Sequence, residues 1–355
     1  MRIRTHKSKR LSALAGVAGF FLAVACLSAA ESANAPQKKS LDNGLPVIYQ
    51  KDTASGVTVL TFLIRGGQKA EPNGMDGLSY MTTRLSVEIP DQNKVQDLMV
   101  KATRYSLTSK GDYSLIQLEC LSESLEDTLK IFAGIMMDPL FSGLRINFVK
   151  ENMGHLQNIQ SDDSVNVGRL AQLDAIFGKT GYGRSIFGTE ESLKKIKGKD
   201  IENFYKQQFR ANRMACAVIS DLDSEKVLAL LQKYLSKFPS GEIAPASDAP
   251  VQAGSAATPK EIFIEKKTKQ CLVSMAFSLP ATSAKAFVLN YLLENLLGKG
   301  PGSRLWGLRS EEKLAYNVNA QVTQMKDAGI LEAYLETDAT KTGAASEALK
   351  KVLAD

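Results

Sequence analysis

The chain has 355 residues, of which 44% are hydrophobic and 23% are charged, a balance typical of a globular protein that can form a core. Its formal net charge is +6, but residues 1–30 carry five basic and no acidic side chains, and removing these five charges leaves +1. A charge so close to zero argues against a nucleic-acid-binding surface. The length beyond this segment is enough for two domains.

Residues 1–30 have the pattern of a secretory signal peptide. A basic start precedes an almost wholly apolar stretch, residues 11–27, and Ser28-Ala29-Ala30 offers a cleavage site. Cys26 follows Ala23-Val24-Ala25, which loosely resembles a lipoprotein box, so lipid attachment is one alternative and an uncleaved membrane anchor is another. We expect a cleaved signal and an exported protein, in a bacterium a periplasmic one.

Three cysteines follow this segment: Cys120, Cys216 and Cys271. An odd number without close spacing does not describe a disulfide framework. Each lies in an apolar, strand-like run, so we expect small core residues rather than reactive thiols.

Residues 41–238 have the pattern of an α+β domain. The runs Val47–Tyr49 and Val57–Ile64 are rich in β-formers, and we expect them to be neighbouring antiparallel strands. Alternating runs on both sides of Lys110-Gly111-Asp112 predict a hairpin. Further elements are expected as helices over 77–87, 125–138, 146–160, 165–177, from residue 200 onward and over 225–238, with a buried strand over 214–220.

Residues 239–260 are rich in Pro, Ala, Ser and Gly and have no periodicity, which predicts a linker. After it we expect strands over 262–264, 271–279, 316–324 and 330–336 and helices over 284–297 and 344–353. The order strand pair, helix, strand pair, helix thus occurs on both sides of the linker, with Tyr105 and Tyr316 at matching points. We therefore expect two α+β domains of common ancestry, 41–238 and 261–355. The second is expected to be incomplete, because it lacks counterparts to the residues after Met137.

Five segments carry a resemblance to a known family: residues 41–45 (LDNGL), 77–79 (GLS), 182–189 (YGRSIFGT), 204–219 and 302–316 (GSRLWGLRSEEKLAY). In this order they resemble the pitrilysin/insulinase family of metallopeptidases, which includes the mitochondrial processing peptidases. The resemblance runs from Leu41 to the end of the chain. It implies two homologous domains of antiparallel sheet packed with helices, and an inverted zinc motif, H-x-x-E-H, directly after Ser79.

This motif is degenerate here. The resemblance places Tyr80 and Arg84 at the two zinc His positions and Thr83 at the general-base Glu position, with the third ligand position at or near Gln157. Zinc needs imidazole, thiolate or carboxylate ligands, and the positive charge of Arg84 would repel the ion. We therefore expect no zinc, no other cofactor and no catalytic residue in this chain.

Two other residues are alternative ligand candidates. Glu151 is a rival for the third ligand position if the register slips, but one carboxylate without the other ligands cannot hold zinc. His155 is the single His outside residues 1–30, and Cys120 and Cys216 show no ligand spacing to it. We expect His155 to be a surface or helix-packing residue.

A second pair of positions is intact. The resemblance implies that Arg309 and Tyr316, seven residues apart, hold the peptide substrate and help to stabilise the charge that develops on the scissile carbonyl. A fixed cation and a hydroxyl donor can do this without a metal of their own. The alternative is an exposed Arg at a helix end and an ordinary strand Tyr.

The resemblance leads to three hypotheses. The first is a non-catalytic, substrate-binding subunit of a heterodimeric zinc metallopeptidase, in which a zinc-bearing paralogue pairs with this chain and an extended peptide adds to a sheet edge. The second is a non-peptidase scaffold protein, like the core subunits that this fold supplies to respiratory complexes. The third is an autonomous metallopeptidase with unusual ligands.

Overall fold

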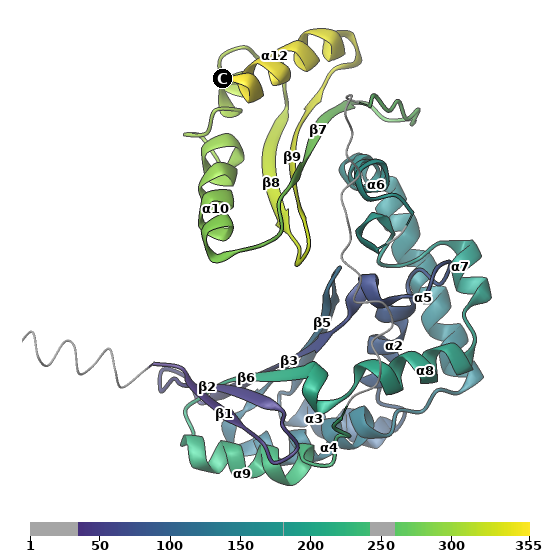
Figure 1. The fold of residues 1–355 in the computed structure, drawn as a ribbon, viewed down its shortest axis with the longest axis vertical. Helices are drawn as coiled ribbons and strands as arrows, with labels where there is room; N and C mark the ends of the chain where they lie inside the picture. The colour runs from purple at the N-terminus through teal and green to yellow at the C-terminus, as the bar shows by residue number, and fades with distance from the viewer. Residues whose placement is uncertain (1–34, 180, 242–259) are drawn as a thin grey trace, which may run out of the picture.

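The computed structural model describes residues 35–179, 181–241 and 260–355, which form two β-sheets and their helices (Figure 1). The expected signal peptide, residues 1–30, lies outside the described residues, as do positions 242–259 of the expected linker. The first sheet has six strands in the order β1-β2-β6-β3-β5-β4, and the second has three in the order β7-β9-β8. The predicted α+β class is confirmed.

The elements of the first sheet occupy residues 37–235. Its strands are β1 (Gln37–Ser40), β2 (Pro46–Lys51), β3 (Val57–Arg65), β4 (Arg104–Ser109), β5 (Tyr113–Leu121) and β6 (Met214–Ser220). Its helices are α2 (Leu78–Ser86), α3 (Gln92–Val100), α4 (Leu125–Met137), α5 (Gly143–Asp162), α6 (Ser164–Phe177), α7 (Glu190–Lys195), α8 (Gly198–Gln208) and α9 (Ser224–Leu235).

The elements of the second sheet follow. Its strands are β7 (Cys271–Leu279), β8 (Asn317–Gln324) and β9 (Gly329–Thr337). Its helices are α10 (Ala284–Gly298), α11 (Trp306–Ser310) and α12 (Thr342–Ala354). None of the helices in the described part of the chain is long and apolar enough to span a membrane.

The main core lies under one face of the first sheet. Every second residue of β3 and β5 is buried, as in the opposed pairs Leu60–Leu118 and Phe62–Ile116. This alternation is expected of an antiparallel sheet with one packed face. Helices α4 and α9 cover that face, and Figure 1 shows them on the side away from the second sheet.

One strand pairing differs from the prediction. Strands β2 and β3 are not neighbours, because β6 lies between them, parallel to β2 and antiparallel to β3. The composition of residues 52–56 favours neighbouring antiparallel strands, yet the connection passes over β6, a strand that is about 160 residues away in the sequence. The predicted hairpin of β4 and β5 is confirmed.

The second sheet repeats part of the first. The order β7-β9-β8 matches β3-β5-β4, and α10 stands in the chain where α2 stands in the first half. Two further features of this half concern residues 262–264 and helix α10. Residues 262–264, expected as a strand, form none, and Phe263 is 90% exposed. Helix α10 also has six large apolar side chains that are more than half exposed: Phe287, Val288, Leu289, Tyr291, Leu292 and Leu296.

The two sheets are joined through the turn between β8 and β9. We call Lys69, Asp112, Tyr182 and Asp327 the Tyr182 cluster. The Tyr182 hydroxyl donates to Asp112 Oδ1 at 2.5 Å, and the backbone N–H of Lys326 donates to Asp112 Oδ2 at 2.8 Å. Lys69 forms an ion pair with Asp327 in which both side chains are largely buried.

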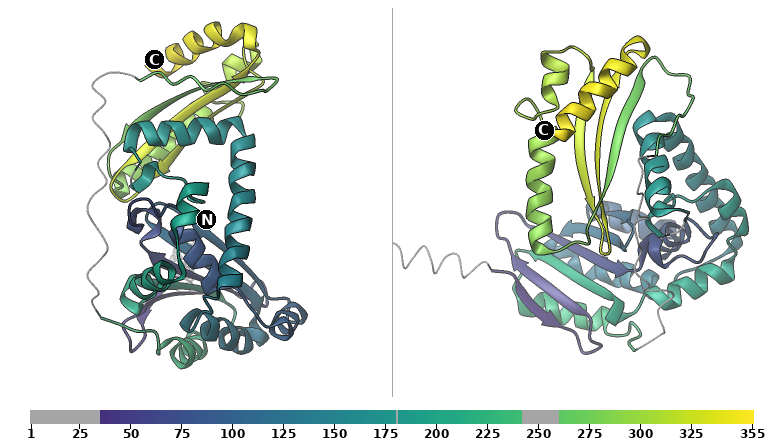
Figure 2. Two further views of the ribbon diagram at one scale, coloured as in Figure 1. Left: turned by 90° about the vertical axis from the view of Figure 1, so that its right-hand side faces the viewer. Right: turned by 45° about the horizontal axis from the view of Figure 1, so that its top comes forward.

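Helix α6 makes further contacts of the same interface. It lies beside β7, as Figures 1 and 2 show. Arg169 donates to Thr323 Oγ1 at 2.6 Å and lies 3.5 Å from a Glu332 carboxylate oxygen. Gln172 donates to Ser274 Oγ at 2.8 Å. Apolar side chains from both halves pack around Tyr182; they are Phe177, Met325, Ala328 and Ile330. The two sheets therefore share a core as well as polar contacts.

We expect Tyr182→Phe to destabilise the protein. Burial and the hydrogen bond to Asp112 raise the pKa of Tyr182, so the phenol stays neutral and donates. Without it, the half-buried Asp112 carboxylate loses a donor, which should lower the free energy of unfolding by about 1–3 kcal/mol. Urea unfolding followed by circular dichroism measures this.

The matched control is Tyr334→Phe on β9, whose hydroxyl accepts one long hydrogen bond within the described residues, from the Asn319 side-chain amide at 3.4 Å. Its unfolding midpoint should stay close to that of the wild type. Equal midpoints for the Tyr182 variant and the wild type would show that the cluster does not stabilise the interface.

Candidate functional site

Helix α2 carries three of the four positions at which the sequence departs from a zinc site. It packs between the β4–β5 end of the first sheet and helices α5 and α8. Its apolar side chains Leu78, Met81 and Leu85 are fully buried in a second core with α5 and α8. The predicted helix over residues 77–87 is confirmed as Leu78–Ser86.

The start of α2 is fixed by backbone geometry and by a buried carboxylate. Gly77, before the first helical residue, has φ +92°, and a Cβ there would lie 2.9 Å from Met153 and 3.0 Å from the backbone of Gly188. The N–H groups of Gly77 and Ser79 donate to the Glu71 carboxylate at 3.2 and 2.8 Å. An acidic side chain in this place satisfies unpaired donors and suits the positive end of the helix.

Arg184 holds the same corner from the other side. Its buried guanidinium donates to the carbonyls of Glu71 and Pro72 at 3.0 and 3.2 Å and lies 3.4 Å from Asp76. Burial raises the pKa of Glu71 well above its ordinary value, while the two backbone donors and then Arg184 oppose this shift. Residues 182–189, recognised in the sequence as a motif, are thereby tied to the start of α2.

Tyr80 and Gln157 meet around Phe187 of that motif. The rings of Tyr80 and Phe187 pack edge to face, with centroids 4.9 Å apart and planes at 89°. The Gln157 side-chain amide donates to the Phe187 carbonyl at 2.9 Å. The structure thus brings together one predicted zinc His position and the predicted third ligand position, and both side chains take part in contacts with Phe187.

Thr83 and Arg84 make contacts of other kinds. The buried Thr83 hydroxyl donates to the backbone carbonyl of Ser79 at 2.8 Å, one helical turn earlier. Arg84 Nη1 donates to the Tyr105 hydroxyl on β4 at 3.2 Å. Burial alone would lower the pKa of Arg84, but the hydrogen bond with Tyr105 and the nearby Glu88 raise it, so the side chain stays a cation.

These residues do not fit a zinc ion. Burial raises the pKa of Tyr80, which keeps its phenol protonated, and Thr83, Arg84 and Gln157 offer no strong zinc ligand. Residues 35–179, 181–241 and 260–355 contain no group of three or more His, Cys, Asp or Glu side chains able to hold a metal ion. Glu151 and His155 are both exposed on α5 and do not join the contacts around Phe187.

Two of the three described cysteines are buried core residues. Cys120 and Cys216 belong to the main core, and burial raises the pKa of both thiols. Cys271, at the start of β7, is half-buried. The described cysteines are free, as expected without a disulfide framework.

Arg309 and Tyr316 lie on the second half of the chain, and both side chains are exposed. Arg309 is in α11, with its guanidinium carbon 4.9 Å from the centre of the Trp306 ring, a cation–π contact. Tyr316 precedes β8; its backbone N–H donates to Glu336 at 2.8 Å while its side chain is 57% exposed. No contact joins this pair to the residues around Phe187 in the described part of the chain.

Some residues that build the site were not predicted from the sequence. Phe187 and Arg184 both belong to the motif of residues 182–189, but the sequence assigns neither of them a role, and it gives no signal for Glu71. Glu71 lies six residues before Gly77, too far for the usual capping position, so local capping rules give no signal for it. Tyr105 was noted only for its correspondence with Tyr316.

Comparison with known proteins agrees with this geometry. Residues 195–355 match the family described as "Peptidase M16 inactive domain". The "Non-peptidase homolog YmxG" of Helicobacter pylori is 24% identical over 319 residues, which cover 87% of this chain and 72% of that protein. Subunit 1 of the mitochondrial cytochrome b-c1 complex of Mus musculus is 24% identical over 244 residues, which cover 66% of this chain and 49% of that subunit.

A solved structure agrees as well. The crystal structure of a peptidase M16 inactive domain from Pseudomonas fluorescens superimposes with a TM-score of 0.80 at 20% identity, covering 90% of this chain and 78% of that one. At this identity the likeness concerns the fold. Taken with the family match and the order of the sequence motifs, it shows that the chain is similar to the peptidase M16 family, and over residues 195–355 to the inactive domain of that family.

Proposed function

We propose that this chain is a non-catalytic structural subunit that acts by binding another protein chain. The observation that carries the proposal is the state of the four substituted positions. Tyr80 and Gln157 contact Phe187, Thr83 bonds within its own helix, and Arg84 bonds to Tyr105. A helix that is anchored this firmly without ligand chemistry supports a role for the fold itself rather than for hydrolysis.

A partner chain of the same family is the binding partner that we favour. The mouse relative is by its name a subunit of a complex, and non-peptidase homologues occur among the relatives. The partner of this chain would carry the zinc ion that these residues do not fit. Export from the cytoplasm, inferred from residues 1–30, and a linker over residues 239–260 between domains 41–238 and 261–355 are part of the same proposal.

A second candidate function is favoured by the exposure of Arg309 and Tyr316. In this version the subunit also helps to hold the peptide and supplies both side chains to the active site of a zinc-bearing partner. Their exposure leaves the guanidinium and the hydroxyl accessible to a partner or a peptide. Neither group needs a metal to stabilise an oxyanion.

We expect the purified chain to retain far less than one zinc ion per molecule and to cleave no peptide. The reason is that a phenol, a hydroxyl, a guanidinium and an amide replace the ligands and the general base. Elemental analysis after dialysis against zinc measures the first outcome. A zinc-motif paralogue treated in parallel is the control, and one zinc per chain here would contradict the proposal.

We expect Arg309→Ala to separate the two candidate functions. If Arg309 completes a partner's site, turnover by the mixture of this chain and a zinc-motif paralogue should fall on the order of 100-fold. Tyr316→Phe should give a smaller loss of the same kind. Size-exclusion chromatography should show that both variants still form the complex.

Arg304→Ala is the matched control, because Arg304 is also an exposed arginine of the second half and precedes α11. It should leave turnover unchanged. Unchanged turnover in the Arg309 and Tyr316 variants, with the complex intact, would exclude the substrate-binding role and leave the structural one. Failure of the chain to join any complex would contradict both.

A further inference from the structure

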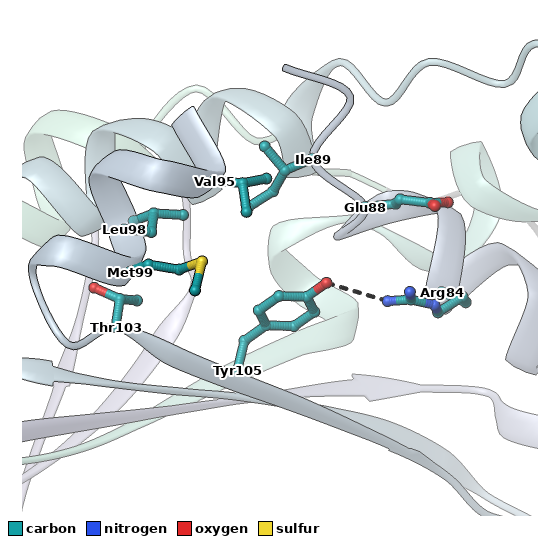
Figure 3. Close-up of a pocket in the computed structure, with 8 residues that line it drawn as sticks. All are labelled: Arg84, Glu88, Ile89, Val95, Leu98, Met99, Thr103 and Tyr105. Atoms are coloured by element: carbon teal, nitrogen blue, oxygen red, sulfur yellow. Dashed lines mark hydrogen bonds between the residues drawn. The ribbon is translucent and has the colours of Figure 1, made fainter. Parts of the chain in front are cut away.

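Beside Arg84 there is a cavity of about 210 Å³ between the end of α2, helix α3 and strand β4 (Figure 3). The residues that line it are Arg84, Glu88, Ile89, Val95, Leu98, Met99, Thr103 and Tyr105. Arg84 is the one of the four predicted zinc-site positions that lines this cavity; Tyr80, Thr83 and Gln157 do not. The cavity is therefore a separate feature from the contacts around Phe187.

One wall of the cavity is apolar. Figure 3 shows Ile89, Val95, Leu98 and Met99 along it, on the side away from Arg84. Met99 is 72% exposed, so its flexible side chain forms part of the rim rather than of the core. An unbranched, polarisable side chain at a rim adapts to apolar groups of different shapes.

The other end is polar, and Arg84 is the cation available there. One of its five N–H donors is used by the Tyr105 hydroxyl. Within the described residues its guanidinium makes no other hydrogen bond and no ion pair within 4.0 Å. Glu88 is held instead by Arg145, whose Nη2 lies 3.4 Å from Glu88 Oε2 and donates to the Glu88 carbonyl at 2.7 Å.

The charges of this corner favour an anion as ligand. The two arginines and the one carboxylate leave a net charge of +1 among Arg84, Glu88 and Arg145. A guanidinium presents a fork of donors that fits a carboxylate with two parallel hydrogen bonds. Since Arg145 already neutralises Glu88, a ligand carboxylate would pair with Arg84.

The size of the cavity restricts what else the ligand can carry. Sites for drug-sized molecules usually measure about 300–1,000 Å³, so this cavity suits one aliphatic side chain rather than a cofactor. The neighbouring strand β4 is the last strand of its sheet, with β5 as its one neighbour. A peptide whose last residue entered the cavity could therefore continue along the outer edge of β4.

We propose that this cavity binds the C-terminus of a peptide that ends in an aliphatic residue such as Leu, Ile or Val. The α-carboxylate pairs with Arg84 beside the Tyr105 hydroxyl, and the aliphatic side chain packs against Val95 and Met99. The peptide is bound at this site, and no covalent bond is made or broken there. It does not require a partner subunit, so its failure and that of the proposed function are separate results.

Fluorescence polarisation with the full chain and a labelled hexapeptide that ends in Leu tests the proposal. Three unlabelled competitors are compared: the same peptide as its C-terminal amide, a version that ends in Ser, and free 4-methylpentanoate. We expect the amide and the Ser peptide each to bind at least 10-fold more weakly, because one lacks the charge and the other lacks the apolar group. We expect the free acid to compete poorly, because it has no backbone to pair with β4.

Variants test the assignment to Arg84. Arg84→Gln should weaken binding of the acid peptide at least 10-fold and leave binding of the amide unchanged. Lys94→Gln is the matched control, since Lys94 is an exposed cation of α3 that does not line the cavity. Equal affinity for acid and amide, an unchanged affinity in a folded Arg84→Gln variant, or no binding by the wild type would overturn the proposal. Competition by the free acid as strong as that by the peptide would overturn the assignment to peptide C-termini.

Discussion

The hydrogen bonds from Gly77 and Ser79 to the buried Glu71 carboxylate are the constraint on which the site depends. They fix where α2 begins and therefore which side chains of α2 face the sheet, α5 and the loop of residues 182–189. Gly77 contributes because its positive φ and missing Cβ let the helix start against Gly188 and Met153. Arg184 then binds the carbonyls of Glu71 and Pro72, so the helix start and the loop form one unit.

The second constraint is the interface between the sheets. The Tyr182 cluster and the shared apolar contacts around Met325 attach the β8–β9 turn to the first sheet, and Arg169 and Gln172 extend the attachment along α6. Tyr182 belongs to the same loop as Arg184 and Phe187. One loop therefore connects the start of α2, the contacts of Tyr80 and Gln157, and the position of the second sheet.

What could be predicted from the sequence follows from the range of each interaction. The β4–β5 hairpin follows from a local alternation and the strand β3 from a local run of β-formers, and both elements were predicted correctly. The insertion of β6 between β2 and β3 is a pairing over long sequence separation, which no local pattern reports. Helix α3 was missed because Leu98 is its one buried residue, although Asp91 caps it by accepting from Asn93.

The candidate site shows the same division. The resemblance to the peptidase family implied that Tyr80, Thr83, Arg84 and Gln157 stand at the positions of a zinc site. They did not predict that Phe187 would contact both Tyr80 and Gln157, because a contact between α2, α5 and a loop is a tertiary contact. The cavity beside Arg84 could not be predicted from the sequence either, since three of its eight lining residues come from α3, a helix that the sequence did not predict.

The structure also explains how the ligand chemistry of α2 can change while the fold is kept. The residues that hold α2 in place are Glu71, Gly77 and Ser79 at its start and the buried Leu78, Met81 and Leu85 along its length. None of them is a ligand or general-base position. Tyr80 and Arg84 are only half-buried, so a phenol and a guanidinium fit there without disturbing the core, and Thr83 satisfies its hydroxyl within the helix. Because the framework and the ligand positions use different residues of one short helix, the residues at the ligand positions can change while the helix keeps its place.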